Sequence, residues 1–183
     1  MIIDHNKKFV FIHVYRTAGS SIEHAFGGAN PHCDMHIKLE DLPEATGYFS
    51  FAFIRNPWDR ILSSYMYLTK RNKFKGTWEE YIKSFTRPPL NTTKKFAQHD
   101  MVKNCDYIGR FEYLQKDFND ICKHIGVPQR KLPHIWKTNH QRYVQVYTPE
   151  QIDIIDKASA GDIEQYGFTF KSSATKNFGR IIK

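Results

Sequence analysis

The stretch over residues 8–26 reads KFVFIHVYRTAGSSIEHAF. Its first part, residues 8–14, is short and rich in Phe and Val, which is typical of a buried strand. The chain then turns on small residues and continues over 20–26 as a short helix. The turn carries an arginine, hydroxyl side chains and a glycine. The stretch therefore predicts a strand–turn–helix unit whose turn is rich in hydrogen-bond donors.

A second stretch, FAFIRNPWDRILSSYMYL at residues 51–68, repeats this order. The aromatic and apolar run 48–55 predicts a strand, and residues 57–71 carry apolar side chains at helical spacing. Asn56 can cap this helix, and Pro57 suits its first position. Two strand–turn–helix units thus follow each other along the chain.

The remaining pattern extends this alternation. It predicts a third strand and three further helices, at residues 107–111 and at 78–85, 113–126 and 149–160, respectively. Strands that alternate with helices predict an α/β fold. We expect a single-domain, P-loop-like three-layer sandwich with a mainly parallel central sheet flanked by helices.

The 183 residues suit one domain over 1–183, with a motif-bearing core at about 8–170 and a C-terminal tail at 171–183. Lys and Arg number 27 against 19 Asp and Glu, which gives a net charge of +8. This balance favours anionic partners such as nucleotides, nucleic acid, acidic glycans or anionic membranes, although general solubility explains it equally well.

The cysteines Cys33, Cys105 and Cys122 are scattered and odd in number, so the sequence indicates neither a disulfide framework nor a zinc site. No metal site is expected. A reducing compartment fits this usage, and the apolar run near the N-terminus is too short for a signal peptide or a membrane span. A cytoplasmic location is the expectation, although a chain trimmed of an anchor reads the same.

The turn after the first strand lies where α/β sheets bind ligands. A helix N-terminus offers backbone N–H groups and the positive end of a dipole. Gly19 would permit a tight turn and close approach of an anion, and Arg16 adds a fixed charge. Three hydroxyls add donors, on Thr17, Ser20 and Ser21. Together these groups would hold a phosphate or sulfate, although a plain capped strand–helix junction is the alternative.

The second turn repeats this chemistry. Arg55 ends a strand and Ser63 lies two turns into the next helix, so both can meet one phosphate. Arg60 lies in the first helical turn, where its charge opposes the dipole and indicates an anionic partner or a nearby carboxylate. We nevertheless expect Arg60 on a solvated helix face, and Trp58 in the core.

The pair formed by RTAGSS and FIRNPWDRILSSY resembles the sulfotransferases that use 3′-phosphoadenosine 5′-phosphosulfate (PAPS), most of all the Golgi-type carbohydrate sulfotransferases and their bacterial relatives. Two later segments, YIGRFEYLQKDFNDICKHIGV and YTPEQIDIIDKASAGDIEQYGFTF, resemble further segments of that family. The resemblance spans roughly residues 8–170, with four motifs in order.

The resemblance implies transfer of a sulfuryl group from PAPS to an acceptor hydroxyl, most simply on a saccharide, as in enzymes of the EC 2.8.2 type. It implies that Arg55 and Ser63 hold the 3′-phosphate. It also implies a loop for the 5′-phosphosulfate, made of Arg16, Thr17, Ala18, Gly19, Ser20 and Ser21. Arg16 stands where the family usually has lysine, so it can stabilise the leaving group by charge but not as a proton donor.

The acceptor hydroxyl needs a base. In relatives that act on glycans containing uronic acid, a histidine just before the second strand has this role, which points to His36 first and His32 second. Glu23 and His24, early in the first helix, are alternatives. For His99 a structural role is expected.

Two other functions remain open at this point. One is a P-loop kinase or nucleotidase, against which the missing GxxxxGK pattern speaks. The other is a non-catalytic module that binds nucleic acid or an anionic glycan, which explains the charge but not two separate anion loops. We therefore expect no nucleic-acid partner.

Overall fold

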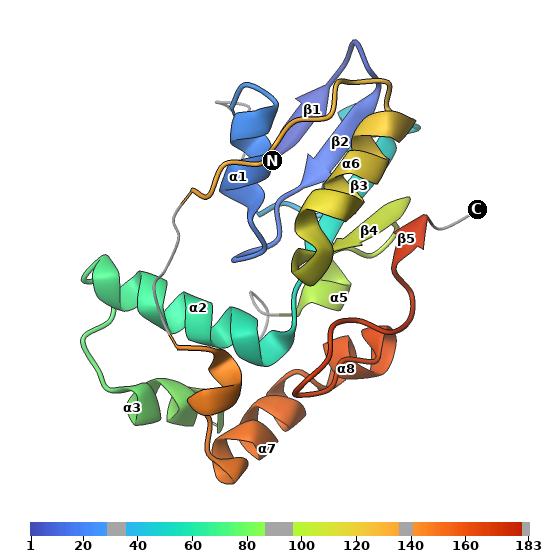
Figure 1. The fold of residues 1–183 in the computed structure, drawn as a ribbon. Helices are drawn as coiled ribbons and strands as arrows, with labels where there is room; N and C mark the ends of the chain where they lie inside the picture. The colour runs from blue at the N-terminus through green and yellow to red at the C-terminus, as the bar shows by residue number, and fades with distance from the viewer. Residues whose placement is uncertain (29–35, 87–96, 136–140, 181–183) are drawn as a thin grey trace.

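The computed structural model describes residues 1–28, 36–86, 97–135 and 141–180. Within this part of the chain a five-stranded sheet runs in the order β1-β2-β3-β4-β5 (Figure 1). Its strands are β1 (Ile2–Asp4), β2 (Phe9–Ile12), β3 (Phe49–Ile54), β4 (Tyr107–Arg110) and β5 (Gly179–Arg180).

The three central strands are parallel, as predicted, and the edge strands β1 and β5 pair antiparallel to them. Ile12 pairs with Ala52, and Ile54 pairs with Arg110, so the carboxyl ends of β2, β3 and β4 meet at one edge. The sequence did not predict β1 or β5, because both are too short to show a hydrophobic pattern. Strand β5 lies within the segment expected as a tail.

Helices cover both faces of the sheet. Those of the described residues are α1 (Gly19–Ala25), α2 (Pro57–Lys70), α3 (Trp78–Lys83), α5 (Gln98–Met101), α6 (Leu114–His124), α7 (Pro149–Ala158) and α8 (Ala160–Tyr166). Short 3₁₀ turns lie at Leu39–Asp41, Pro43–Ala45, Ser84–Thr86, Phe111–Tyr113 and Tyr143–Gln145. The predicted helix over 149–160 is α7, which ends at Ala158, whereas α8, which follows Ser159, was not predicted.

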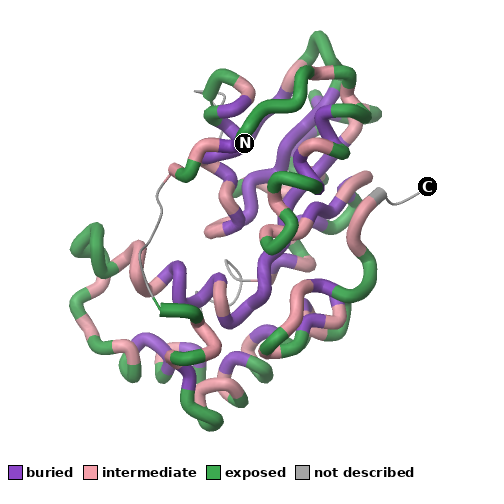
Figure 2. Tube along the Cα trace, viewed as in Figure 1, coloured by how far each residue is buried: buried purple, intermediate pink, exposed green. Residues whose placement is uncertain are grey.

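Alternate side chains of a strand point to opposite faces, and this divides the core in two. One half joins the phenylalanines of β2 and β3 to α1 and α6, for example Phe11 and Phe53 to Phe118. The other half joins Ile12 and Ile54 to helices α2, α3, α7 and α8. The buried central strands lie between these layers (Figure 2). The predicted three-layer α/β sandwich is confirmed.

Asn56 fixes the start of α2. Its Oδ1 accepts from the backbone N–H groups of Trp58 (3.1 Å) and Asp59 (3.3 Å), which confirms the predicted cap. Its Nδ2 donates to the carbonyls of Thr169 (2.9 Å) and Ser172 (2.8 Å), so the same side chain ties the C-terminal segment to α2. Trp58 is 2 % exposed and lies in the core, as expected.

Candidate functional site

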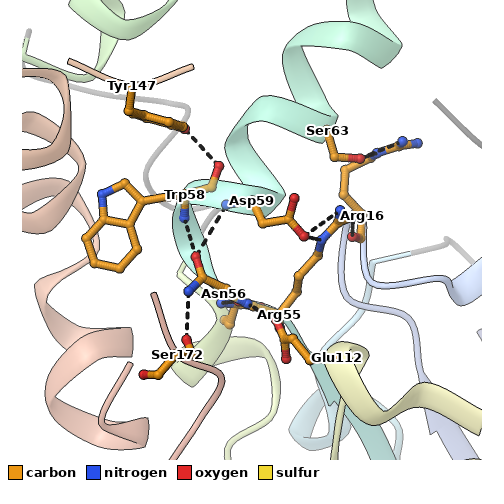
Figure 3. A network of polar contacts seen from close by, with 10 residues as sticks. Arg16, Arg55, Asn56, Trp58, Asp59, Ser63, Glu112, Tyr147 and Ser172 are labelled. Atoms are coloured by element: carbon orange, nitrogen blue, oxygen red, sulfur yellow. Dashed lines mark hydrogen bonds and ion pairs between the residues drawn. The ribbon is translucent and has the colours of Figure 1, made fainter. Parts of the chain in front are cut away.

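The two predicted anion loops lie side by side at the carboxyl edge of the sheet (Figure 3). The first loop, residues 16–21, follows β2, and the second loop, at Arg55 and Asn56, follows β3. Between them opens a cavity of about 480 Å³. Apart from Thr17, all the residues predicted to bind the cofactor line it, namely Arg16, Ala18, Gly19, Ser20, Ser21, Arg55 and Ser63. The structure therefore brings both motifs to one site.

In the first loop, the residues with left-handed backbone torsions are not the one that the sequence predicts. Arg16 (φ 63°) and Ala18 (φ 65°) adopt the left-handed region, whereas Gly19 does not. The expectation that Gly19 supplies the tight turn is therefore wrong. A β-carbon on Gly19 would lie 2.1 Å from the His13 ring, so glycine is required here by the close approach of that ring.

Gly19→Ala is expected to lower the free energy of unfolding by about 1–3 kcal/mol, because the added methyl must displace the buried His13 ring. Displacement would break the 2.8 Å hydrogen bond from His13 Nδ1 to Glu23. Thermal denaturation measures the loss. Ser20→Ala, at the next position of α1, is the control and should change the melting temperature much less.

The hydroxyls of this loop have different roles. Thr17 is fully buried and its Oγ1 donates to the Val14 carbonyl at 2.8 Å, so its side chain holds the turn and does not face the cavity. Ser21 lines the cavity, and its Oγ also accepts from the backbone N–H of Ile135 at 3.3 Å. Ser20 lines the cavity at the start of α1.

Two guanidinium groups enter the cavity from the two loops. Arg16 donates from Nε and Nη2 to Ser63 Oγ at 3.2 and 2.8 Å and lies over the Tyr67 ring. Arg55 donates from Nη1 to the Arg16 carbonyl at 3.1 Å and from Nε to Asp59 Oδ2 at 2.8 Å. Burial lowers the pKa of Arg16, and the charge of Arg55 acts in the same direction. An anion between these cations would relieve their repulsion.

Arg60 is 0 % exposed, so the expected solvated position is wrong. Its Nη1 donates to the Tyr15 carbonyl at 3.4 Å, and its Nη2 lies 3.8 Å from Asp162 Oδ2. Burial lowers the pKa of Arg60 to about 10, while Asp162 opposes the shift, so the group stays charged at neutral pH. The adverse charge in the first helical turn was the signal for this carboxylate partner.

His36 lies beside the first loop. Its ring packs edge-on against Tyr15 and His13, with centroids 5.6 and 5.1 Å away. Its Nδ1 lies 2.8 Å from the His13 carbonyl, and a carbonyl only accepts, so Nδ1 carries the proton. Neutral His36 therefore keeps a lone pair on Nε2. Burial lowers the pKa of His36, which favours the neutral ring.

The other candidates for the base differ in position. His32 lies outside the described residues. Glu23 is buried, bonded to His13 Nδ1 at 2.8 Å and paired with the N-terminal ammonium of Met1. Burial alone would raise the pKa of Glu23, but these hydrogen bonds outweigh it and lower the pKa overall. His24 is exposed on α1.

The rest of the cavity wall was not predicted from the sequence. It comes from two distant segments, and its lining residues are Phe111, Glu112, Leu114, Gln115, Leu132, Pro133, His134 and Ile135. Gln115 joins these segments, because its Oε1 accepts from Leu132 N–H at 2.9 Å and its Nε2 donates to the Arg130 carbonyl at 2.9 Å. Arg110 pairs with Asp117, with 3.1 Å between Nε and Oδ2.

Glu112 joins this wall to the second loop. Its Oε1 accepts from the backbone N–H of Asn56 at 2.7 Å. Burial raises the pKa of Glu112, while this hydrogen bond and the charge of Arg55 oppose the shift. Within the described ranges, no group of three or more His, Cys, Asp or Glu side chains is placed to hold a metal ion. No helix in those ranges has both the length and the apolar character to cross a membrane.

Comparison with known proteins places the chain in a family. A family model described as "Sulfotransferase family" matches residues 1–169. An uncharacterized protein from Archaeoglobus fulgidus is 36% identical over 90 residues, which cover 45% of this chain and 72% of that protein. A solved sulfotransferase from Alicyclobacillus acidocaldarius is 16% identical with a TM-score of 0.41, and the match covers 68% of this chain and 55% of that chain. By its match over residues 1–169, this chain belongs to the sulfotransferase family.

Proposed function

We propose that this protein transfers a sulfuryl group from PAPS to a hydroxyl group of a saccharide. The observation that carries the proposal is the meeting of Arg16 and Arg55, from two different strand ends, in one cavity with Ser63. Neither loop alone distinguishes an anion site from a capped helix start. Two guanidinium groups and a hydroxyl around one cavity match a ligand with two separate anionic groups.

The cavity fits such a nucleotide in size and in chemistry. Its volume of about 480 Å³ lies in the range of small-molecule sites. Arg16 and Arg55 make one part of its wall basic, whereas Leu114, Leu132 and Ile135 make another part apolar. This division suits the phosphates and the base of one nucleotide. When bound, PAPS would supply the activated sulfuryl group.

The residues of this chain would then act by position and charge. Arg55 and Ser63 would hold the 3′-phosphate, and Arg16 with the backbone at the start of α1 would hold the 5′ side. Since Arg16 contacts Ser63, these two binding regions are continuous. Arg16 would stabilise the charge that develops on the leaving oxygen, because a guanidinium does not give up a proton.

His36 is the proposed general base. Its Nε2 lone pair would accept the proton of the acceptor hydroxyl as that oxygen attacks sulfur. The hydrogen bond from Nδ1 to the His13 carbonyl would keep the ring in the required tautomer. His32 is the second candidate. No metal is proposed for any step.

Binding of 3′-phosphoadenosine 5′-phosphate (PAP), measured by isothermal calorimetry, tests the donor site. We expect submillimolar affinity that weakens at least about tenfold in Arg55→Ala, because a charge-assisted contact to phosphate is lost. Absence of PAP binding in the wild-type protein would rule out the proposal. A thermal shift with ATP–Mg²⁺ but not with PAP would favour the kinase alternative, and steeply salt-dependent DNA binding would favour the binding module.

The acceptor is tested separately by transfer of labelled sulfate to glycans, phenols and lipids. We expect product on a glycan, and product only on a phenol or lipid would contradict the saccharide assignment. A cytoplasmic location is also proposed, on the basis of cysteine usage: Cys105 and Cys122 are buried free thiols.

A further inference from the structure

Gln98, at the start of α5, holds the backbone of Arg55. It is 0 % exposed, and its carboxamide makes both possible bonds to that residue. The Arg55 N–H donates to Gln98 Oε1 at 2.8 Å, and Gln98 Nε2 donates to the Arg55 carbonyl at 2.9 Å. The side chain of Gln98 thus pairs with Arg55 as a neighbouring strand would.

Arg55 needs such a partner because it lies just past the paired part of the sheet. The pairing of β3 with β2 ends at Ala52, and its pairing with β4 ends at Ile54. The backbone torsions of Arg55 set the direction in which its guanidinium leaves the strand. Gln98 is therefore placed to fix the direction of the Arg55 side chain.

Asp162, from α8, sets the orientation of the Gln98 amide. It is 1 % exposed, and its Oδ2 accepts from Gln98 Nε2 at 3.1 Å and from the Gln98 N–H at 3.2 Å. Its Oδ1 accepts from His99 at the backbone N–H (2.8 Å) and at Nδ1 (2.7 Å). Because a carboxylate only accepts, it turns Nε2 toward itself and leaves Oε1 for the Arg55 N–H.

Asp162 reaches the first loop as well. Arg60 lies between them, with Nη2 3.8 Å from Asp162 Oδ2 and Nη1 3.4 Å from the Tyr15 carbonyl. Tyr15 precedes Arg16 in the chain. The buried carboxylate of Asp162 is therefore linked to both anion loops. It is linked to the second loop through Gln98 and to the first loop through Arg60.

We propose that Gln98 and Asp162 are positioning residues for nucleotide binding, and that they act by fixing the backbone from which Arg55 reaches the 3′-phosphate. The inference rests on the proposed function. It assigns a role to a glutamine and an aspartate that do not line the cavity. A merely structural role would lower stability without a specific link to Arg55.

A double-mutant cycle on PAP affinity tests this role. Gln98→Met keeps the length of the side chain and removes both hydrogen bonds to Arg55. We expect it to weaken PAP binding about tenfold, and to weaken binding of adenosine 5′-phosphate, which lacks the 3′-phosphate, much less. In an Arg55→Ala background, Gln98→Met should have almost no further effect on PAP affinity, because the group that it positions is already gone.

Ile155→Val is the control for lost stability, because Ile155 is fully buried in α7, outside the cavity lining. It should lower the melting temperature and leave PAP affinity unchanged. If Gln98→Met does not fold, Asp162→Asn takes its place, since it conserves size but turns a donor toward Gln98 and His99. An effect that is the same with and without Arg55 overturns the inference alone. Absence of PAP binding in the wild-type protein overturns the proposed function first.

Discussion

Sulfuryl transfer is expected to fall by about 100- to 1,000-fold when Arg16 is replaced by methionine. The reason is the position of its charge. Arg16 lines the cavity and lies within hydrogen-bond distance of Ser63. A negative charge that develops on the leaving oxygen in this cavity would therefore interact with the Arg16 guanidinium in partly desolvated surroundings. Transfer of labelled sulfate at saturating PAPS measures the loss, and PAP calorimetry separates it from a loss of binding.

The Arg16→Lys variant separates the effect of the positive charge from the effect of the guanidinium shape. Lysine restores the charge without the planar fork that contacts Ser63, so we expect its rate to return to within about tenfold of the wild-type rate. Arg71→Met is the matched control, because Arg71 also lies over the Tyr67 ring but does not line the cavity. Full activity of Arg16→Met would remove Arg16 from the mechanism. A lysine variant as slow as the methionine variant would show that charge alone is insufficient.

The structure also explains why the two motifs occur together. Arg16 and Ala18 have left-handed backbones, which cost of order 1–3 kcal/mol each in residues with a side chain. Arginines of the second motif hold the same loop, because Arg60 donates to the Tyr15 carbonyl and Arg55 donates to the Arg16 carbonyl. The second motif thus contributes to the shape of the first loop as well as to the charge of the cavity.

The parts of the site that depend on local sequence could be predicted. The apolar runs of β2 and β3 and the Asn56 cap act over a few residues, so they place Arg16 and Arg55 at strand ends without knowledge of the tertiary structure. The parallel pairing of those strands then brings the two arginines to one edge.

The remaining parts depend on contacts between distant segments. The local sequence predicts Arg60 on the surface, because its carboxylate partner Asp162 lies far away in the chain. The role of Gly19 follows from the His13 ring, and the apolar wall needs Leu132 to meet Leu114. No local pattern in the sequence carries these pairings, because each depends on how helices pack after the sheet has formed.

Replacing His36 by alanine is expected to lower sulfuryl transfer by about 100- to 10,000-fold, the range associated with loss of a positioned general base. PAP affinity should stay near the wild-type value, since His36 does not line the cavity. His24→Ala is the control, because this histidine is exposed on α1 near the same loop. A variant at position 36 that keeps the wild-type rate would exclude this base and leave His32 as the candidate to test.

The pH profile of the wild-type enzyme gives an independent test of the same assignment. A base acts when it is unprotonated, so activity is lost as pH falls through the pKa of His36. Burial lowers this pKa from the ordinary histidine value of about 6.5, so transfer should stay nearly constant at and above that pH and decline only below it. Any activity left in His36→Ala should lack this decline. A rate that instead falls as the pH is lowered from about 8 to about 7 would contradict His36 as the base, because a histidine with a lowered pKa does not titrate in that range.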